Sequence, residues 1–281
     1  SFSAQSLRTP RPPDSGLRPN SASRLARTPV SETPSASGGQ AAEAENRPII
    51  LQAGPGCRAH TPLPVLGAMF RTLAEQASVP VVAHLDHGYS AEDCRIAIDC
   101  GFTSVMFDGS RKPIAQNISE TAEIVQMAHK AGVSCEGEIG FVGYDGGEES
   151  SGTDPEEAAR FARETGVDAM AISAGNVHLQ QGAGKGLDVD RIRAIEAVTD
   201  VPLVIHGGSG VPMAQRTHLA RTSAICKFNI GTELRMAFGN ALREAVNKDS
   251  ARFDRVTILK ETHDPVVAAT RTVLRAFRGA A

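Results

Sequence analysis

Three histidines in this chain have the residue type and the spacing of ligands to a catalytic metal ion. His87 follows the apolar run VPVVAHL (79–85), His178 follows DAMAIS (168–173), and His206 ends VPLVIH (201–206). Neutral imidazoles bind zinc well, and three of them leave the fourth position of a tetrahedral ion open. Because each histidine lies just past a different apolar run, we expect them to converge on one Zn²⁺.

The remaining histidines are interpreted as ordinary residues. A single histidine is more often a satisfied core or surface group than a metal ligand. Four of them fall in expected loops or helices and are interpreted in this way: His60, His129, His218 and His263. His84 lies two residues before Asp86 on the same run, so we expect it to pack against or support the site.

Polar side chains also stand at the ends of the other apolar runs. They are Asp108 in TSVMFD (103–108), Glu136 and Glu138 in VSCEGEI (133–139), Asn176 after 168–173, and Lys227 and Asn229 in AICKFNI (224–230). One such residue would be a weak signal. Together they indicate that one end of the strands forms a single polar face.

Two glycine-rich turns indicate a site for an anion. IHGGSGVP (205–212) and NIGTE (229–233) each lie between an apolar run and an expected helix. Glycines there let backbone N–H groups approach a phosphate at a helix N-terminus, and hydroxyls add donors. The candidate phosphate-binding residues are Gly207, Ser209, Asn229, Gly231 and Thr232. The alternative is that both segments are only tight turns.

The elements that must position these residues alternate along the chain. The expected strands are PIILQA (48–53) and the six runs at 79–85, 103–108, 133–139, 168–173, 201–206 and 224–230. Amphipathic stretches predict helices at 63–77, 90–100, 118–131, 154–166, 188–198, 212–222, 232–246 and 264–277. Continuously apolar strands separated by helices indicate a parallel sheet that is covered on both faces.

This alternation predicts an α/β fold of the (β/α)₈ TIM-barrel type, in which functional residues lie at the carboxyl ends of the strands. Only seven strands are visible, and AAEAEN (41–46) reads as the tail of a helix before the 48–53 strand. The first strand is therefore expected to be missing or replaced, leaving either an open barrel or an unusual N-terminus.

Residues 1–45 are predicted to be a disordered or atypical segment, and residues 46–281 to form the barrel domain. The first forty residues are rich in Ser, Pro, Arg and Gly and have few branched or aromatic apolar residues. Such a segment buries too little surface to offset its ordering entropy. An organelle transit peptide is the alternative interpretation, although no apolar stripe accompanies the arginines.

The composition excludes some classes of function. The chain has 281 residues with a formal net charge of −3, which argues against a nucleic-acid-binding protein. No apolar run approaches the roughly 20 residues that span a bilayer. Five scattered cysteines without a CxxC pair favour reduced thiols, and we expect a cytoplasmic protein.

Six segments in this order resemble the class II, metal-dependent ketose-bisphosphate aldolases. They are HLDHG (84–88), SVMFDGS (104–110), CEGEIG (135–140), TDPEEAARFARETGVDAMAIS (153–173), PLVIHGGSGVP (202–212) and KFNIGTELR (227–235). The resemblance covers about residues 47–281. It implies a lyase that reversibly cleaves a ketose 1,6-bisphosphate to dihydroxyacetone phosphate and an aldehyde, through a zinc-stabilised enediolate.

The resemblance also assigns roles to residues. His87, His178 and His206 would bind zinc, while Asp108 and Glu138 would line the metal site, where the ion can shift and a second monovalent or divalent cation can bind. Asp86 would be the acid/base at the hydroxyl of the cleaved carbon, beside a ligand, where a general base belongs. A glutamate on the loop after 133–139, Glu148 or Glu149 (Glu149 in our assignment), would move the enediolate proton. The five turn residues would hold the phosphorylated end of the substrate, and the chain would be a homodimer or homotetramer.

This sequence departs from the family pattern at several points. A glycine that normally follows the second zinc histidine and offers its amide to phosphate is Leu179 here, which weakens phosphate binding or signals another substrate. The segment between Glu138 and Asp154 is short, and the first strand is not visible. Three alternatives therefore stay open: a degenerate barrel that binds sugar phosphate without turnover, a Schiff-base aldolase with Lys227 as nucleophile, and a metal-dependent barrel hydrolase.

Overall fold

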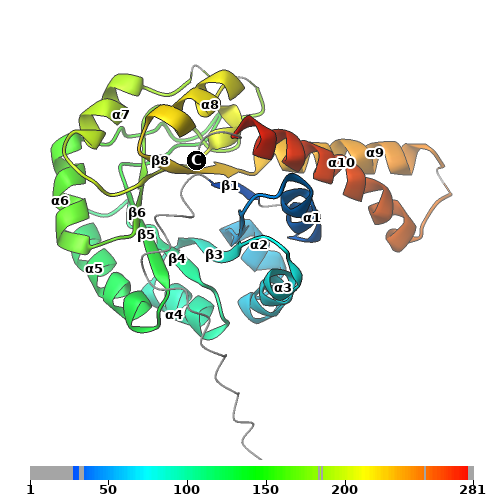
Figure 1. The fold of residues 1–281 in the computed structure, drawn as a ribbon, viewed down its shortest axis with the longest axis horizontal. Coiled ribbons are helices and arrows are strands. Elements are labelled where there is room, and N and C mark those ends of the chain that lie inside the picture. Colours follow the sequence, from blue (N-terminus) through cyan, green and yellow to red (C-terminus); the bar gives the residue numbers. More distant parts are fainter. Residues whose placement is uncertain (1–27, 32–34, 183, 185, 250, 278–281) are drawn as a thin grey trace, which may run out of the picture.

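A closed barrel of eight parallel strands forms the centre of the protein in this computed structural model (Figure 1). The structure describes residues 28–31, 35–182, 184, 186–249 and 251–277. Neighbouring strands follow chain order, and the last pairs with the first. The strands are β1 (Thr28–Ser31), β2 (Ile49–Ala53), β3 (Val81–Gly88), β4 (Ser104–Phe107), β5 (Ser134–Ile139), β6 (Ala169–Ile172), β7 (Leu203–Ile205) and β8 (Ile225–Ile230).

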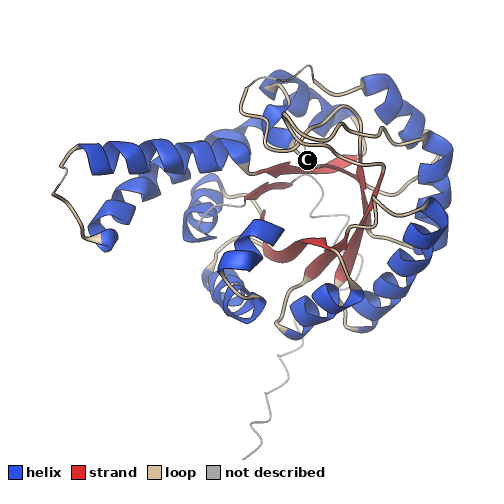
Figure 2. Cartoon of the chain, turned by 180° about the vertical axis from the view of Figure 1, so that it is seen from behind, coloured by secondary structure: helices blue, strands red, loops and turns tan. Residues whose placement is uncertain are grey.

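Helices surround the barrel on its outer side (Figure 2). They are α1 (Ser35–Glu45), α2 (Pro55–His60), α3 (Leu63–Gln76), α4 (Ala91–Asp99), α5 (Ile114–Lys130), α6 (Pro155–Thr165), α7 (Val189–Glu196), α8 (Met213–Thr222), α9 (Thr232–Asn247) and α10 (Arg255–Ala276), with a short 3₁₀ helix, η2 (Gly208–Gly210). The core lies between the strands and this helical layer, where side chains such as Leu85, Phe161 and Ile205 are fully buried.

The seven predicted strands are confirmed as β2 to β8, and the predicted barrel class is confirmed with them. The strand interiors are buried on both faces, which is why their sequences are continuously apolar instead of alternating. The short helix α2 was not predicted, and α10 begins at Arg255, well before the predicted start at residue 264. Pro265 lies inside α10, and the helix is capped at Asp254.

The first strand is replaced by a short segment, so the barrel is closed, not open. β1 consists of only four residues, TPVS, from the segment that we predicted to be disordered or atypical. Its backbone pairs on both sides, with Val30 opposite Ile50 in β2 and Asn229 in β8. A four-residue strand carries too little apolar pattern to be recognised in a Ser/Pro/Arg-rich sequence.

The predicted disorder of residues 1–45 is wrong for residues 35–45, which form α1. Ala41 and Ala42 are fully buried, and Glu45 makes ion pairs with Arg271 (2.7 Å) and Arg275 (2.9 Å) of α10. Helix α1 therefore belongs to the barrel domain and lies between α10 and α3 (Figure 1). Residues 1–27 and 32–34 of the same prediction lie outside the described residues.

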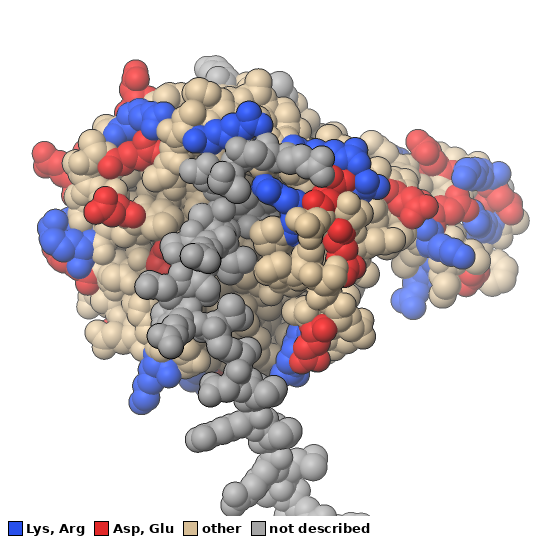
Figure 3. Space-filling model, in the orientation of Figure 1, with Lys and Arg blue, Asp and Glu red and all other residues tan. Residues whose placement is uncertain are grey.

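Helices α9 and α10 form an arm that projects from one side of the barrel (Figures 1 and 2). Several apolar side chains on this arm are exposed: Met236, Val246, Phe253, Val256 and Leu259. Acidic and basic side chains alternate along the visible face of the arm (Figure 3). The arm is thus a polar surface with scattered apolar side chains.

Among the described residues, no helix has the length and apolar character needed to cross a bilayer.

Candidate functional site

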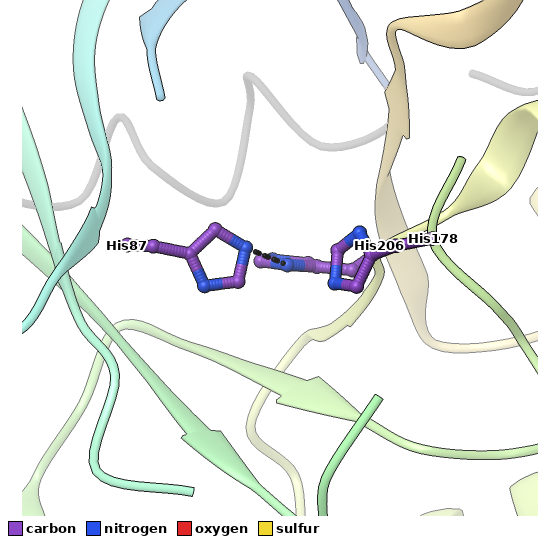
Figure 4. Close-up of side chains that lie close together, drawn as sticks. All are labelled: His87, His178 and His206. Atoms are coloured by element: carbon purple, nitrogen blue, oxygen red, sulfur yellow. Dashed lines mark hydrogen bonds between the residues drawn. The ribbon is translucent and has the colours of Figure 1, made fainter. Parts of the chain in front are cut away.

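The three predicted histidines meet at the carboxyl ends of the strands (Figure 4). One ring nitrogen from each of His87, His178 and His206 lies within 4.8 Å of the other two. Nε2 of His87 is 3.0 Å from Nδ1 of His206. His206 is fully buried and His87 nearly so, whereas His178 is partly exposed. The predicted convergence of these side chains is confirmed.

His87 reaches the site because strand β3 bends at its end. The pairing of β3 with β4 shifts register between Leu85 and Gly88, and His87 has a φ of 51°. Left-handed backbone at a residue other than glycine costs roughly 1–3 kcal/mol. Asp86 and His87 would face opposite ways on a regular strand, but here both line the same cavity. The bend also requires Gly88, because a Cβ there would lie 2.8 Å from the carbonyl oxygen of Met106.

His178 and His206 are brought together by close backbone packing. A Cβ on Gly207 would lie 2.2 Å from the carbonyl oxygen of Val177, and φ of Gly207 is 61°, so only glycine fits between the two segments. Asn176 ties them further, because its Nδ2 donates to the carbonyl oxygen of His206 at 3.0 Å. The loop after β5 holds His178 from the other side: the backbone N–H of His178 donates to Gly143, and the Tyr144 ring stacks on the imidazole with 5.1 Å between centroids.

Hydrogen bonds to carboxylates determine which nitrogen of two histidines is available for an ion. Nδ1 of His87 lies 2.7 Å from Oδ2 of Asp108, and Nε2 of His206 lies 3.0 Å from Oε1 of Glu136. Each of these nitrogens carries the hydrogen, since an ionised carboxylate can only accept. The nitrogens left for an ion are then Nε2 of His87 and Nδ1 of His206, which are hydrogen-bonded to each other here. Tetrahedral ligands at the usual zinc–nitrogen distance stand roughly 3.3 Å apart, close to the 3.0 Å between them.

A buried polar network supports His206 from inside the barrel. Glu136, which accepts from His206, also accepts from Nζ of Lys227 at 2.6 Å. Nζ of Lys227 also lies 3.0 Å from Nε2 of His84. Nδ1 of His84 in turn lies 2.8 Å from the hydroxyl of Ser104. The expected supporting role of His84 agrees with these contacts. Lys227 is only 5% exposed and does not line the cavity, which argues against a Schiff base at this residue.

The carboxyl groups of Glu138, Asp108 and Asp86 give one side of the site a potential that favours a positive charge. Burial raises the pKa of Glu138 well above its usual range, and the negative charge of Asp108 raises it further. One oxygen of Glu138 is buried without a hydrogen-bond partner among the described residues. It lies 3.7 Å from Nδ1 of both His87 and His206. Burial lowers the pKa of His87, but the charges of Asp86, Asp108 and Glu138 outweigh it and raise that pKa to about 10.

His87, Asp108 and Glu138 form a second group whose ligand atoms lie within 4.8 Å of one another. This group shares His87 with the histidine cluster. The arrangement agrees with the expectation that Asp108 and Glu138 line the metal site.

Asp86 is held at the cavity wall by two amide side chains. Nε2 of Gln52 donates to Oδ2 at 3.2 Å, and Nδ2 of Asn229 donates to Oδ1 at 3.1 Å. Burial raises the pKa of Asp86, but the positive charges of His87, His206 and Lys227 outweigh burial and lower it below its usual value. Oδ1 lies 3.9 Å from Nε2 of His87. A carboxylate in this state can accept a proton from a group bound beside the histidines.

A cavity of about 550 Å³ opens above these side chains. All five predicted phosphate-binding residues line it: Gly207, Ser209, Asn229, Gly231 and Thr232. The hydroxyl of Ser209 accepts from the N–H of Glu233 at 3.3 Å, which links the two glycine-rich turns. Helix α9 begins at Thr232, so its N-terminal N–H groups and Arg235 add positive potential to the same wall.

The structure does not bring the predicted loop glutamate to the site. Glu149 is exposed and does not line the cavity, and Glu148 pairs with Arg111 at 2.7 Å on the outer side of the loop. The catalytic role of Glu149 stays a prediction. The loop residue that does line the cavity is Tyr144.

Four features that shape the site were not predicted from the sequence: Gln52, Arg58, the contact of Glu136 with His206, and Tyr144. Gln52 stands near the end of a predicted strand, as the other site residues do, so strand position could have identified it. Nothing in the local sequence marks Arg58 or Tyr144.

Comparisons with known proteins give a consistent result. Residues 37–281 match the family model described as "Fructose-bisphosphate aldolase class-II". The chain is 40% identical to the 6-phospho-5-dehydro-2-deoxy-D-gluconate aldolase of Shouchella clausii, over 85% of this chain and 83% of that protein. It is 36% identical to the fructose-bisphosphate aldolase of Geobacillus stearothermophilus, over 84% and 85%. The crystal structure of the YdjI aldolase from Escherichia coli K12 superposes with a TM-score of 0.76 at 28% identity, covering 92% of this chain and 94% of that one.

Proposed function

Because the chain belongs to the class II fructose-bisphosphate aldolase family and is a lyase of that family, we propose a specific reaction for it. The reaction is the zinc-dependent, reversible cleavage of a ketose 1,6-bisphosphate to dihydroxyacetone phosphate and an aldehyde. The observation that carries the proposal is the cluster of His87, His178 and His206 with the ionised Asp86 beside it.

The residues present fit a zinc ion. His87, His178 and His206 would hold it, with Asp108 and Glu138 on the acidic side of the site. The unpartnered oxygen of Glu138 and the raised pKa of His87 both indicate a site built for a cation. When bound there, Zn²⁺ supplies a Lewis acid that withdraws electron density from the substrate ketone.

The chain's own residues supply binding and proton transfer. Ser209, Thr232 and the backbone N–H groups of the two glycine-rich turns bind the phosphate next to the ketone. Asp86 takes the proton from the hydroxyl of the carbon that becomes the aldehyde, and returns it in the condensation direction. Gln52 and Asn229 fix the direction of the Asp86 carboxylate, so that it does not have to reorient during the reaction.

A second candidate substrate is favoured by the relative with 40% identity, which is named for 6-phospho-5-dehydro-2-deoxy-D-gluconate. That compound also carries a ketone next to a phosphorylated carbon, so it presents the same group to the phosphate turns. The two candidates differ at the far end, which is a phosphate in one and a carboxylate in the other. Both belong to the same reaction type, and the choice between them depends on residues at the far side of the cavity.

A substrate panel with and without a chelator tests the proposal. We expect cleavage of at least one of the two candidate substrates, with loss of activity in EDTA and recovery after addition of Zn²⁺. Activity that survives EDTA, together with a borohydride-trapped adduct on Lys227, would instead establish Schiff-base chemistry. A folded protein that binds zinc but cleaves neither substrate would favour a binding role without turnover.

Leu179 offers a separate test of phosphate binding. It lines the cavity, is 50% exposed and has a φ of 60°, where only glycine is unstrained. We expect Leu179→Gly to lower KM for the phosphorylated substrate several-fold without loss of thermal stability, because the change removes the side chain next to the backbone amide and removes the strain. Leu179→Ala is the matched control, since it removes the side chain but keeps the Cβ. An equal decrease of KM in both variants would assign the effect to side-chain bulk alone.

The predicted homodimer or homotetramer and the cytoplasmic location stay predictions. Light scattering on the purified chain would determine its oligomeric state.

A further inference from the structure

Arg58 donates three hydrogen bonds to the backbone around the site. It lies on α2 and is partly buried. Nη1 donates to the carbonyl oxygens of Ala53 at 3.0 Å and Asp86 at 2.6 Å, and Nη2 donates to that of His87 at 3.0 Å. One guanidinium thus joins the end of β2 to the two consecutive site residues at the end of β3.

Two of these carbonyl groups, those of Asp86 and His87, lie beyond the regular pairing of β3 with its neighbours. The pairing of β2 with β3 ends at Ala53 opposite Leu85, one residue before Asp86. On the other side, the pairing of β3 with β4 is interrupted between Leu85 and Gly88. Carbonyl groups in a partly buried bend need donors from elsewhere, and here a side chain provides them.

The same bend holds the backbone in an unfavourable conformation. His87 has a φ of 51°, which a residue with a Cβ adopts only when its surroundings impose it. The N–H of His87 has only a weak partner, the sulfur of Met106 at 3.4 Å. Among the hydrogen bonds to the backbone of Asp86 and His87, the strong ones are therefore the charge-assisted bonds from Arg58.

We propose that Arg58 is a positioning residue that holds the bent end of β3 so that Asp86 and His87 both face the cavity. The proposal rests on the proposed zinc site and concerns the precision of that site. An arginine suits this role because its planar group offers several donors in a fixed geometry and is always charged. A lysine ammonium could reach only part of the same set.

A substrate-binding role for Arg58 fits the structure less well. Arg58 does not line the cavity, although its neighbour Cys57 does. Its donors point at the backbone of Ala53, Asp86 and His87 instead of into open space. The two roles give different kinetic results, which makes them separable.

The test is Arg58→Met in the full-length protein. We expect zinc affinity, measured by competition with a chromophoric chelator, to fall about 10-fold to 100-fold, as is typical for loss of a partner that orients a metal ligand. We expect kcat to fall as well, with a smaller change in KM. Added guanidinium ion should restore part of the zinc affinity by occupying the vacated position. The zinc affinity of Arg58→Lys should lie between that of Arg58→Met and that of the wild type.

Arg71→Met on the neighbouring helix α3 is the matched control, since Arg71 is exposed and outside the site. It should bind zinc as the wild type does. Unchanged zinc affinity and kcat in Arg58→Met would overturn the proposal, and so would a higher KM alone, which would indicate substrate binding. If Arg58→Met does not fold, Arg58→Lys decides, because wild-type zinc affinity in that variant would also overturn it. A wild-type protein that binds no zinc would instead refute the proposed function.

Discussion

Replacing His206 with alanine is expected to abolish tight zinc binding and, with it, measurable cleavage. His206 is fully buried and contributes Nδ1 to the cluster, 3.0 Å from Nε2 of His87. His87 and His178 alone would leave two protein nitrogens for the ion, fewer than a catalytic zinc site uses. The metal content of the purified variant, measured by mass spectrometry after dialysis, should fall from about one zinc per chain to near zero.

The control for this experiment is His129→Ala. His129 pairs with Asp168 on the surface, at 2.9 Å, and lies outside the site. The His129→Ala variant should keep its zinc and its activity. Because His206→Ala also removes a partner of Glu136, the thermal midpoint of both variants must be compared, so that unfolding is not mistaken for loss of a ligand. Wild-type zinc stoichiometry in a folded His206→Ala would reject the ligand assignment.

Replacing Asp86 with alanine should leave zinc binding intact but abolish cleavage, unlike the replacement of His206, which removes both. Asp86 is not one of the three histidine ligands, and its Oδ1 lies 3.9 Å from Nε2 of His87. General acid–base catalysis typically contributes about 10²-fold to 10⁴-fold, so kcat should fall by that order. Asp86→Asn keeps the volume of the side chain and should show a similar loss, because the amide cannot accept the substrate proton.

Isotope exchange gives this prediction a sharper form. Removal of a carbon-bound proton from dihydroxyacetone phosphate does not involve the hydroxyl group that Asp86 is proposed to deprotonate. The Asp86 variants should therefore still exchange that proton with D₂O, measured by NMR, while condensation and cleavage are lost. Turnover near the wild-type level would remove Asp86 from the mechanism. Loss of exchange as well would assign Asp86 a role in holding the metal.

Most of the barrel could be predicted because its strands are buried on both faces and are therefore continuously apolar. Most of β2 to β8 were recognisable for this reason, and so was the polar end at which His87, His178 and His206 gather. The strand β1 could not be recognised, and of the helix α1 only the tail was, at 41–46, because the other residues of both elements are ordinary for a loop. Their structure depends on neighbours far along the chain: β8 for β1, and α10 for α1.

The fold class, the family and the three histidines with Asp86 could be inferred from the order of residue types along each strand. The orientation of these side chains could not, because it depends on the folded barrel. The contact of Glu136 with His206 joins residues tens of positions apart, and so do the bonds from Arg58. His87 lies beside them in its left-handed bend. Hydrogen-bond geometry of this kind depends on distances across the folded barrel, which spacing along the chain does not specify.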